Sequence, residues 1–330
     1  MTHASASRPL LWPLVPVYRL GLALRELQLR KGIKPIRRLR WPVVSIGNLS
    51  TGGAGKTPFT IALAKALTAR GLHVDVLSRG YGRQRSALPL LVDPGGTAQE
   101  FGDEPLVIAR ESGVPVYVAA ERYEAGRLAE SEASGSSSLG LHLVDDGFQH
   151  RQLARDVDIL LLSRRDLCDH LLPAGNLREA LDAAERAHVI AIPADEADVE
   201  AEIKARGWKA QVWRVRRHME IPRVEGPVLA FCGIARPDQF FKGLESAGVK
   251  LAARMAFADH HNYTERDFEG LAKGARDAGA TALLSTEKDR VRIGVLSASL
   301  PIQTVKLRIE IENESAAIEW LIDHLHGPRG

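Results

Sequence analysis

A glycine-rich stretch that ends in Gly55-Lys56-Thr57 contains the residue types that bind a nucleotide triphosphate. Glycines let the backbone turn so that its N–H groups face an anion, the lysine reaches the β- and γ-phosphates, and the threonine hydroxyl ligates Mg²⁺. We therefore expect this loop to hold nucleotide and Lys56 to act in catalysis. The expected nucleotide-binding residues of the loop are Ser50, Thr51, Gly52, Gly53, Ala54, Gly55, Lys56 and Thr57.

The residues on either side of the loop favour this interpretation. The β-branched run at 43–46 predicts a buried strand, and the periodic segment 61–67 predicts a helix. Strand, glycine-rich turn and helix is the order found in a phosphate-binding loop. Ser50 departs from the usual G-x-x-x-x-G-K-[ST] pattern, which has glycine at that place. The alternative is a strand-to-helix turn that holds no phosphate.

A second group of polar residues follows the apolar run at 141–144. Asp145 and Asp146 end this predicted strand, and Gln149 follows closely. In P-loop enzymes an aspartate at a strand end helps to organise Mg²⁺. We expect Asp145, or Asp146 beside it, to hold the metal directly or through water, with Gln149 facing the same crevice. The alternative is an Asp-Asp-Gly turn that only caps a loop.

Asp103 lies at the start of a predicted helix, where two roles fit it. An aspartate at such a place commonly caps the helix. In a kinase, however, an acid near the γ-phosphate accepts the proton of the acceptor hydroxyl. The residues leave both roles open.

Asp259-His260-His261 is the most chemically varied segment of the second half of the chain. Adjacent side chains rarely point at one site, so we do not expect these histidines to share a metal. We expect one of them to orient a catalytic group.

Arg178-Glu179 begins another predicted helix, after a loop that contains proline, glycine and asparagine. The pair either caps that helix or supplies a phosphate contact and a second metal ligand. Both readings stay open.

Alternating strands and helices must position these side chains. Five or six apolar runs between residues 43 and 192 alternate with helical segments, which is typical of a parallel sheet with helices on both faces. The expected fold class is α/β, with a doubly wound parallel sheet of the P-loop NTPase type. The segments 211–217 and 304–311 alternate apolar and polar residues and predict a β-ribbon that joins a second, smaller α/β domain.

These elements predict a division of the chain. Residues 1–40 form an amphipathic, basic N-terminal segment that belongs to the first domain, and residues 41–210 form the P-loop kinase domain. Residues 211–225 and 303–312 form the ribbon. Residues 226–330 form the smaller domain.

The bulk properties exclude several classes of protein. The chain has 330 residues, of which 45% are hydrophobic and 26% charged, so it is globular and long enough for two domains. Its net charge of +3 does not indicate nucleic-acid binding over the whole surface. The 2 cysteines are far apart in sequence, which predicts neither a disulfide framework nor a zinc site and favours a reducing cytosol.

The N-terminal segment combines apolar and basic residues. Its apolar stretch at 10–18 is broken by two prolines and is shorter than the roughly 20 residues that a spanning helix needs. Leu20, Leu24 and Leu27 share one helix face, which beside a basic cluster suits an anionic membrane surface. A helix packed on the core with a solvated basic side fits these residues equally well. The basic cluster comprises Arg19, Arg25, Arg30, Lys31, Lys34, Arg37, Arg38 and Arg40.

Several motifs occur in an order that resembles one family. They are Gly47-Asn48-Leu49-Ser50-Thr51-Gly52-Gly53-Ala54-Gly55-Lys56-Thr57-Pro58, Ser78-Arg79-Gly80-Tyr81-Gly82, Gly102-Asp103-Glu104-Pro105, Asp145-Asp146-Gly147-Phe148-Gln149-His150, Pro173-Ala174-Gly175-Asn176-Leu177-Arg178-Glu179, Asp259-His260-His261 and Thr286-Glu287-Lys288-Asp289. Together they resemble the tetraacyldisaccharide 4′-kinases of the lipid A pathway, over most of the chain. The loop of that family also differs from the common pattern at the place of Ser50.

The resemblance implies an activity and its partners. The activity is ATP- and Mg²⁺-dependent phosphorylation of the 4′-hydroxyl of tetraacyldisaccharide 1-phosphate, which gives lipid IVA. The implied place is the cytoplasmic face of the bacterial inner membrane, where the protein is peripheral. The implied partners are the lipid A disaccharide precursor and the anionic membrane surface, with no nucleic acid and no obligate protein partner.

The resemblance also implies roles for single residues. Asp103 is the implied general base and His260 the histidine that supports it, while Lys56 contacts phosphate. Arg122 and Arg178 are further phosphate contacts, and two α/β/α domains close over the nucleotide. The residues implied to surround Mg²⁺ are Thr57, Asp145, Asp146, Gln149 and Glu179. The helix near Leu20 becomes the expected contact with the membrane and the acyl chains.

Two other functions compete with this one. The first is a GTPase or metallochaperone-like NTPase, but guanine-binding proteins usually carry Asn-Lys-x-Asp, and Thr286-Glu287-Lys288-Asp289 lacks that spacing. The second is a soluble P-loop kinase for a small metabolite, in which the N-terminal helix is only structural.

Overall fold

The computed structural model describes residues 8–33, 35–83, 88–133, 140–294 and 300–326. The strands are β1 (Val43–Asn48), β2 (His73–Ser78), β3 (Leu90–Leu91), β4 (Val116–Val118), β5 (Gly140–Asp145), β6 (Val157–Leu161), β7 (Val189–Pro193), β8 (Gln211–Glu220), β9 (Val228–Cys232), β10 (Leu251–Ala256), β11 (Ala282–Thr286) and β12 (Ile302–Ile311). The helices are η1 (Pro9–Leu14), α1 (Val15–Arg30), α2 (Lys56–Ala69), α3 (Ala98–Phe101), α4 (Asp103–Ser112), α5 (Arg122–Glu132), α6 (Arg164–Leu167), η2 (Leu181–Arg186), α7 (Ala197–Ala205), α8 (Pro237–Ser246), α9 (Glu265–Ala278), α10 (Glu287–Ile293) and α11 (Glu314–His326).

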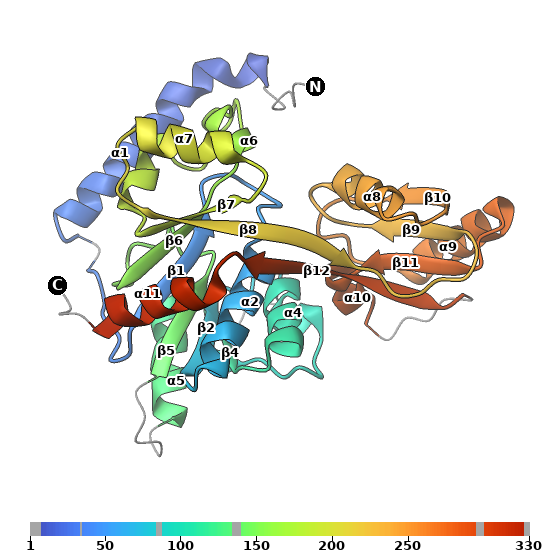
Figure 1. The fold of residues 1–330 in the computed structure, drawn as a ribbon, viewed down its shortest axis with the longest axis horizontal. Coiled ribbons are helices and arrows are strands. Elements are labelled where there is room, and N and C mark those ends of the chain that lie inside the picture. Colours follow the sequence, from blue (N-terminus) through green and yellow to red (C-terminus); the bar gives the residue numbers. More distant parts are fainter. Residues whose placement is uncertain (1–7, 34, 84–87, 134–139, 295–299, 327–330) are drawn as a thin grey trace.

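The strands of the described residues form one sheet that runs through a larger and a smaller part of the molecule (Figure 1). The strand order is β10-β9-β11-β12-β8-β7-β6-β1-β5-β2-β4-β3. In the larger part, β1 lies at the centre and pairs in parallel with β5 and β6. The register places Ile46 beside Asp145. Because the carboxyl ends of parallel strands meet at one edge, the loop after β1 lies beside the acids that end β5.

Helices cover both faces of the sheet in the larger part. On one face, Phe59 of α2, Leu106 of α4 and Ile318 of α11 belong to one apolar core. On the other face, Val199 of α7 and Ala125 of α5 belong to two further clusters. Neighbouring residues of the buried strand β6 point into different clusters, as the side-chain alternation of a strand requires. The predicted doubly wound sheet is confirmed.

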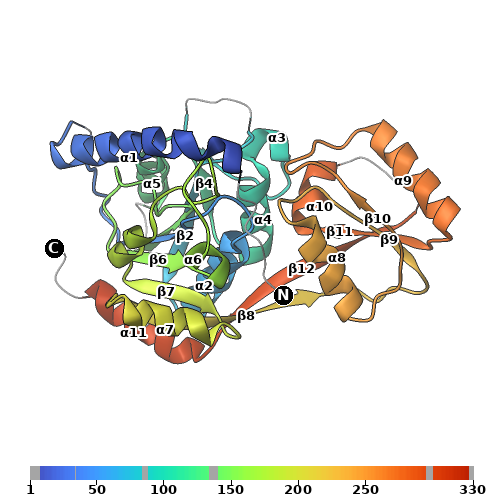
Figure 2. The same cartoon turned by 90° about the horizontal axis from the view of Figure 1, so that it is seen from above.

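The predicted ribbon is confirmed in β8 and β12. These strands pair antiparallel from Ile311 opposite Val215 to Lys306 opposite Glu220. Both run from the larger part to the smaller one (Figures 1 and 2). In the smaller part, β9 pairs in parallel with β10 and β11, and β11 pairs in parallel with β12. Two apolar clusters lie on its two faces, one against α8 and the other against α9.

The C-terminal helix departs from the expected domain division. We expected residues 226–330 to belong to the smaller domain, but α11 packs on the larger part. Its residues Ala317, Ile318 and Leu321 are buried in the same core as Phe59 of α2. The reason is the direction of β12, which leads the chain back along the ribbon before α11 begins. Residues 295–299 and 327–330 of this segment lie outside the described residues.

The N-terminal helix α1 lies across the larger part, on the side opposite α11 (Figures 1 and 2). Leu20 and Leu24 are 60% and 52% exposed, whereas Val15, Tyr18 and Leu22 pack on the apolar cluster that includes Leu160 of β6. These residues anchor the helix on the larger part. None of the helices in the described ranges is long and apolar enough to cross a membrane. Residues 1–7 and Lys34 of the expected N-terminal segment lie outside these ranges.

Candidate active site

A cavity of about 1110 Å³ lies between the two parts of the molecule. The larger part contributes two segments to the lining of this cavity. These are the loop at 51–57, which comes after β1, and the two acids at the end of β5, Asp145 and Asp146. The smaller part lines it with Arg236 and His260. Most of the residues that the sequence nominated for chemistry therefore meet in one place, at the strand ends where α/β proteins bind ligands.

The glycine-rich loop has the backbone that a phosphate cradle needs. Gly52, Gly53 and Gly55 have φ values of 74°, 61° and 88°, in the left-handed region that other residues rarely adopt. Helix α2 begins directly after them, at Lys56, and no side chain caps its first N–H groups. The positive end of the helix is thus free to meet an anion.

Ser50, which we expected to bind nucleotide, lies elsewhere. It is buried, pairs with Leu177 in an antiparallel bridge, and does not line the cavity. The Asn48 side-chain amide donates to the Ser50 carbonyl at 2.7 Å. Ser50 therefore fixes the start of the loop, and Thr51 is the first loop residue at the cavity.

Lys56 belongs to a dense polar cluster at the base of the cavity. Its Nζ donates to Asn48 Oδ1 at 2.8 Å and lies 3.5 Å from Asp146 Oδ1. Arg178 donates to both oxygens of Asp146, at 2.8 and 2.9 Å, and to Asn48 Oδ1 at 2.7 Å. Burial alone would raise the pKa of Asp146, but the hydrogen bonds from Arg178 and the charge of Lys56 hold it well below its usual range. Arg178 thus pairs with an acid here.

Asp145 and Gln149 supply oxygen atoms suited to a hard cation. Burial raises the pKa of Asp145 to about 7, and the charges of Glu104 and Asp146 add to the rise. Gln149 donates to the Asn48 carbonyl at 3.0 Å, while its Oε1 is buried without a hydrogen-bond partner among the described residues. Both residues line the cavity, and a buried oxygen without a partner and an acid with a raised pKa are suited to bind a hard cation.

Side chains of the described residues do not by themselves supply a complete set of ligands for a metal ion. No group of three or more His, Cys, Asp or Glu in the described ranges could hold an ion. That fits Mg²⁺ of a nucleotide enzyme, which keeps phosphate and water ligands and takes only one or two carboxylates.

Arg122 is a buried cation at the same cavity. It starts α5, is only 6% exposed, and its Nε has no hydrogen-bond partner among the described residues. Burial lowers the pKa of Arg122 to about 10, although the nearby carboxylate of Asp146 opposes this. A guanidinium with an unsatisfied nitrogen in a cavity is suited to bind a phosphate oxygen.

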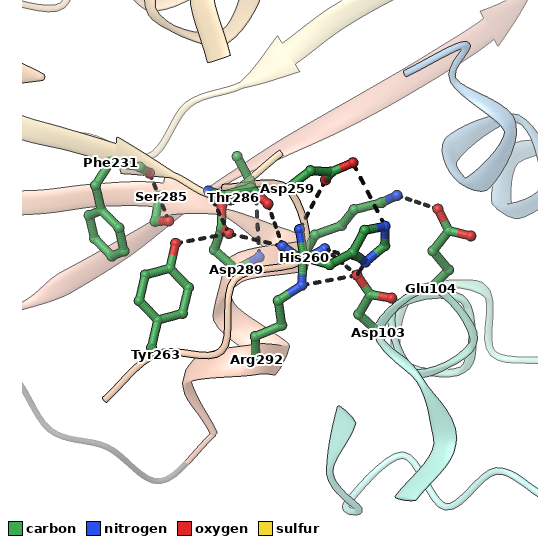
Figure 3. A network of polar contacts seen from close by, with 12 residues as sticks. Asp103, Glu104, Phe231, Asp259, His260, Tyr263, Ser285, Thr286, Asp289 and Arg292 are labelled. Atoms are coloured by element: carbon green, nitrogen blue, oxygen red, sulfur yellow. Dashed lines mark hydrogen bonds and ion pairs between the residues drawn. The ribbon is translucent and has the colours of Figure 1, made fainter. Parts of the chain in front are cut away.

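Asp103 and His260 meet across the two parts (Figure 3). Asp103 starts α4 in the larger part, and His260 comes from the loop before α9 in the smaller part. His260 Nδ1 lies 3.1 Å from Asp103 Oδ2. Asp103 is buried directly behind His260, which itself lines the cavity. Gly102, and not Asp103, is at the N-cap position of α4, and the Asp103 carboxylate contacts His260, so helix capping is not its role.

Opposite charges set the protonation of this pair. Burial alone would raise the pKa of Asp103, but the hydrogen bond from His260 and the charge of Arg292 hold it well below its usual range. The hydrogen bond to Asp103 in turn raises the pKa of His260. Asp103 is thus an ionised acceptor at neutral pH.

Besides Ser50 and the buried Asp103, two further nominated residues do not line the cavity. Nε2 of His261 lies 3.1 Å from Oδ2 of Asp267, and the His261 ring stacks on Phe257. His260 is therefore the histidine that contacts Asp103. Glu179 accepts a hydrogen bond from Arg186 at 2.7 Å and does not line the cavity. The structure therefore does not place Glu179 among the oxygens that could surround a metal.

Three cations at the cavity were missed from the sequence. Arg217 of β8 donates to the Ala54 carbonyl, and Arg236 donates to the Gly52 carbonyl at 3.2 Å. Lys288 of α10 pairs with Glu104 of α4 at 2.5 Å. Only Lys288 had a signal, because it stands in the polar segment that follows the apolar strand at 282–286. Arg217 and Arg236 reach the loop only because the ribbon folds the smaller part over it.

The chain is similar to known proteins over almost its whole length. A profile described as "Tetraacyldisaccharide-1-P 4'-kinase" matches residues 7–326. The chain is 41% identical to a tetraacyldisaccharide 4′-kinase of Koribacter versatilis (strain Ellin345), over 96% of this chain and 99% of the relative. It is 36% identical to one of Anaeromyxobacter sp. (strain K), over 97% and 91%. A crystal structure of LpxK from Aquifex aeolicus in complex with ATP superposes with a TM-score of 0.74 at 30% identity, over 96% of this chain and 98% of that one. The chain belongs to the tetraacyldisaccharide-1-P 4′-kinase family.

Proposed function

We propose that this protein transfers the γ-phosphoryl group of ATP to the 4′-hydroxyl of tetraacyldisaccharide 1-phosphate and so makes lipid IVA for lipid A. One observation carries the proposal. A glycine-rich phosphate loop and His260 line one cavity between the two parts, and the buried carboxylate of Asp103 contacts His260 just behind that lining. Membership of the 4′-kinase family supports the choice of acceptor.

The larger part holds the nucleotide. Backbone N–H groups of residues 51–57 cradle the phosphates, and Lys56 contacts the transferred group. Arg122 turns its unsatisfied nitrogen to a phosphate oxygen. Arg178 acts on phosphate indirectly, because it holds Asp146 and Asn48 beside Lys56.

The acids beside the loop would hold Mg²⁺. Asp145, Asp146, Gln149 and Thr57 line the cavity with oxygen atoms, and we assign the ion to these residues without Glu179. Mg²⁺, when bound, neutralises charge on the β- and γ-phosphates. The raised pKa of Asp145 and the orphaned Oε1 of Gln149 support the assignment.

Asp103 orients the sugar hydroxyl and accepts its proton as the sugar oxygen bonds to the γ-phosphorus. The bond from that phosphorus to the bridging oxygen breaks at the same centre, and ADP leaves. Phosphoryl transfer depends mainly on position and charge, so a weakly basic carboxylate suffices. His260 fixes the carboxylate by a hydrogen bond from the other part of the molecule. The base is therefore complete only when the two parts are closed on each other.

The N-terminal helix places the enzyme at the membrane. The exposed leucines of α1 and the basic residues near it fit the anionic cytoplasmic surface of the bacterial inner membrane, where acyl chains are available. The protein would be peripheral there. Activity that rises with lipid vesicles or detergent micelles would support this, whereas equal turnover of a water-soluble sugar would favour a small-metabolite kinase.

The decisive experiment is transfer of ³²P from ATP to a lipid A disaccharide precursor, with and without Mg²⁺. We expect labelled lipid only with Mg²⁺, and no comparable label from GTP. Asp103→Ala should lower kcat far more than it weakens ATP binding. Equal turnover by this variant would remove Asp103 from the mechanism. Release of labelled inorganic phosphate from GTP, without labelled lipid, would favour a GTPase.

A further inference from the structure

Arg292 of α10 reaches from the smaller part to the carboxylate of Asp103. Its Nε donates to Asp103 Oδ2 at 3.0 Å, and its Nη2 donates to the same oxygen. Nη2 also lies 3.2 Å from His260 Nδ1. The Arg292 side chain is 3% exposed. A buried guanidinium therefore contacts both members of the acid–histidine pair (Figure 3).

The other side of Arg292 is fixed by its own part of the molecule. Nη1 donates to the Gly233 carbonyl at 2.5 Å and lies 3.4 Å from Asp289 Oδ1. Asp289 is fully buried and accepts hydrogen bonds from the Gly233 N–H at 2.9 Å and from the Tyr263 hydroxyl at 3.0 Å. Asp289 Oδ2 accepts from Thr286 Oγ1 at 2.6 Å. Arg292 is thus held at both ends of its guanidinium and cannot turn freely.

The contacts of Asp103 are distributed unequally over its two oxygens. His260 Nδ1 and both Arg292 nitrogens meet at Oδ2. Within the described part of the chain, no hydrogen bond reaches Oδ1. We propose that Arg292 is a positioning residue that holds Asp103 by Oδ2 and leaves Oδ1 as the atom that takes the proton of the acceptor hydroxyl.

The physical reason is geometric as well as electrostatic. A carboxylate held by one hydrogen bond from an imidazole can still rotate about its χ angles, whereas the planar fork of an arginine fixes its direction. The groups that face Asp103 are Arg292 and Lys288 from α10 and His260 from its loop, with Glu104 next to it on α4. Of these groups, Arg292 is the one that donates hydrogen bonds to the Asp103 carboxylate from two nitrogens. A displacement of a catalytic group by about 1 Å can lower the reaction rate by the order of 100-fold.

This assignment rests on the proposed role of Asp103 as base, which Asp103→Asn tests separately. Three variants of α10 test the role of Arg292. Arg292→Met removes the charge and the fork. Arg292→Lys keeps a charge and so protects the fold, but it lacks the fork. Arg290→Met changes an exposed arginine of the same helix and is the matched control. Each is assayed for kcat, for KM of ATP, and for the pH profile of kcat/KM with the lipid acceptor. Melting temperatures report folding.

We expect Arg292→Met to lower kcat about 10- to 100-fold with KM for ATP nearly unchanged. The acid limb of its kcat/KM profile should move to higher pH by about 1 pH unit or more, because the pKa of Asp103 rises when a positive neighbour is removed. Arg292→Lys should restore most of the acid limb but only part of kcat. Arg290→Met should match the parent in every measure.

Other outcomes are distinguishable. If Asp103→Asn is inactive while Arg292→Met and Arg292→Lys keep the parent kcat and pH profile, Arg292 does not position the base and only the present inference fails. If Asp103→Asn turns over normally, the base role itself fails. If Arg292→Met does not fold, Arg292→Lys decides, and a parent-like kcat for it overturns the inference.

Discussion

The buried imidazole of His142 makes the stability of the larger part depend on pH. His142 lies on β5 with no exposure, and its Nδ1 is 2.7 Å from Asp75 Oδ1. Its Nε2 is 3.4 Å from Glu130 Oε1, and Trp41 stacks on the ring at 5.1 Å between centroids. Burial alone would lower the pKa of His142, but Asp75 and Glu130 raise it to about 9. The ring is therefore charged at neutral pH.

The sign and size of the effect follow from this pKa. An unfolded chain releases the His142 proton near 6.5, whereas the folded chain keeps it up to about 9. The stabilisation is fully present below pH 6.5 and is lost as the pH rises through 9. Within this window each pH unit lowers the free energy of unfolding by up to about 1.4 kcal/mol, or roughly 3 kcal/mol in all. Burial also raises the pKa of Asp75, which opposes the stabilisation by the pair, so we treat this sum as an upper limit.

Thermal unfolding over this pH range tests the argument. For a body of this size about 1 kcal/mol corresponds to roughly 2–4 °C in Tm, so we expect a fall of several degrees. The double variant Asp75→Asn, His142→Asn removes both charges and keeps two side chains that can hydrogen bond, so its Tm should change much less over the same range. His218→Asn, at an exposed position of β8, is the control. An unchanged Tm of the parent protein, or an equal fall in the double variant, would refute the reasoning.

Three further predictions concern the site and its supports. Lys56→Ala should lower kcat by about 10²–10³-fold in steady-state assays, since it removes a cation from the transferred phosphate, and a full kcat would contradict its assignment. Glu111→Gln should raise KM for ATP a few-fold at low salt, because it removes the ion pair in which Lys306 Nζ of the ribbon contacts Glu111 of α4 at 2.9 Å. At about 1 M salt the ion pair is screened, so KM should not change. A KM equal to that of the parent at low salt would show that the ion pair does not affect ATP binding. Gly47→Ala should destabilise the protein by about 1–3 kcal/mol in urea unfolding, because the added Cβ would lie 2.5 Å from Cβ of Phe148. A urea midpoint equal to that of the parent would show that this contact relaxes freely.

Local patterns predicted the elements near the phosphate loop well. The strand at β1 and the helix α2 follow from short-range residue preferences and from the backbone freedom of Gly52, Gly53 and Gly55. The ribbon followed from simple alternation in β8 and β12, because each strand has one face against the molecule and one face in solvent. These features depend on residues close in sequence, so the sequence alone was enough.

Domain boundaries that depend on packing between distant residues were harder to predict from the sequence. The sequence placed α11 in the smaller domain because it follows that domain in the chain. Its apolar residues Ile318 and Leu321 match the core around α2 equally well, and only the direction of β12 decides between the two. Likewise, only the packing on β6 shows that Leu22 of α1 faces the core while Leu20 and Leu24 stay exposed.

Residue type and spacing were enough to predict a phosphate loop and two aspartates at a strand end, whereas the pair of Asp103 and His260 was implied only by the resemblance to a family. The folded structure was needed to show that His260 and not His261 contacts Asp103, that Glu179 pairs with Arg186, and that Arg292 contacts Asp103. The contacts of His260 and Arg292 with Asp103 depend on which side chains meet across two parts of the molecule, between residues more than a hundred apart in the chain.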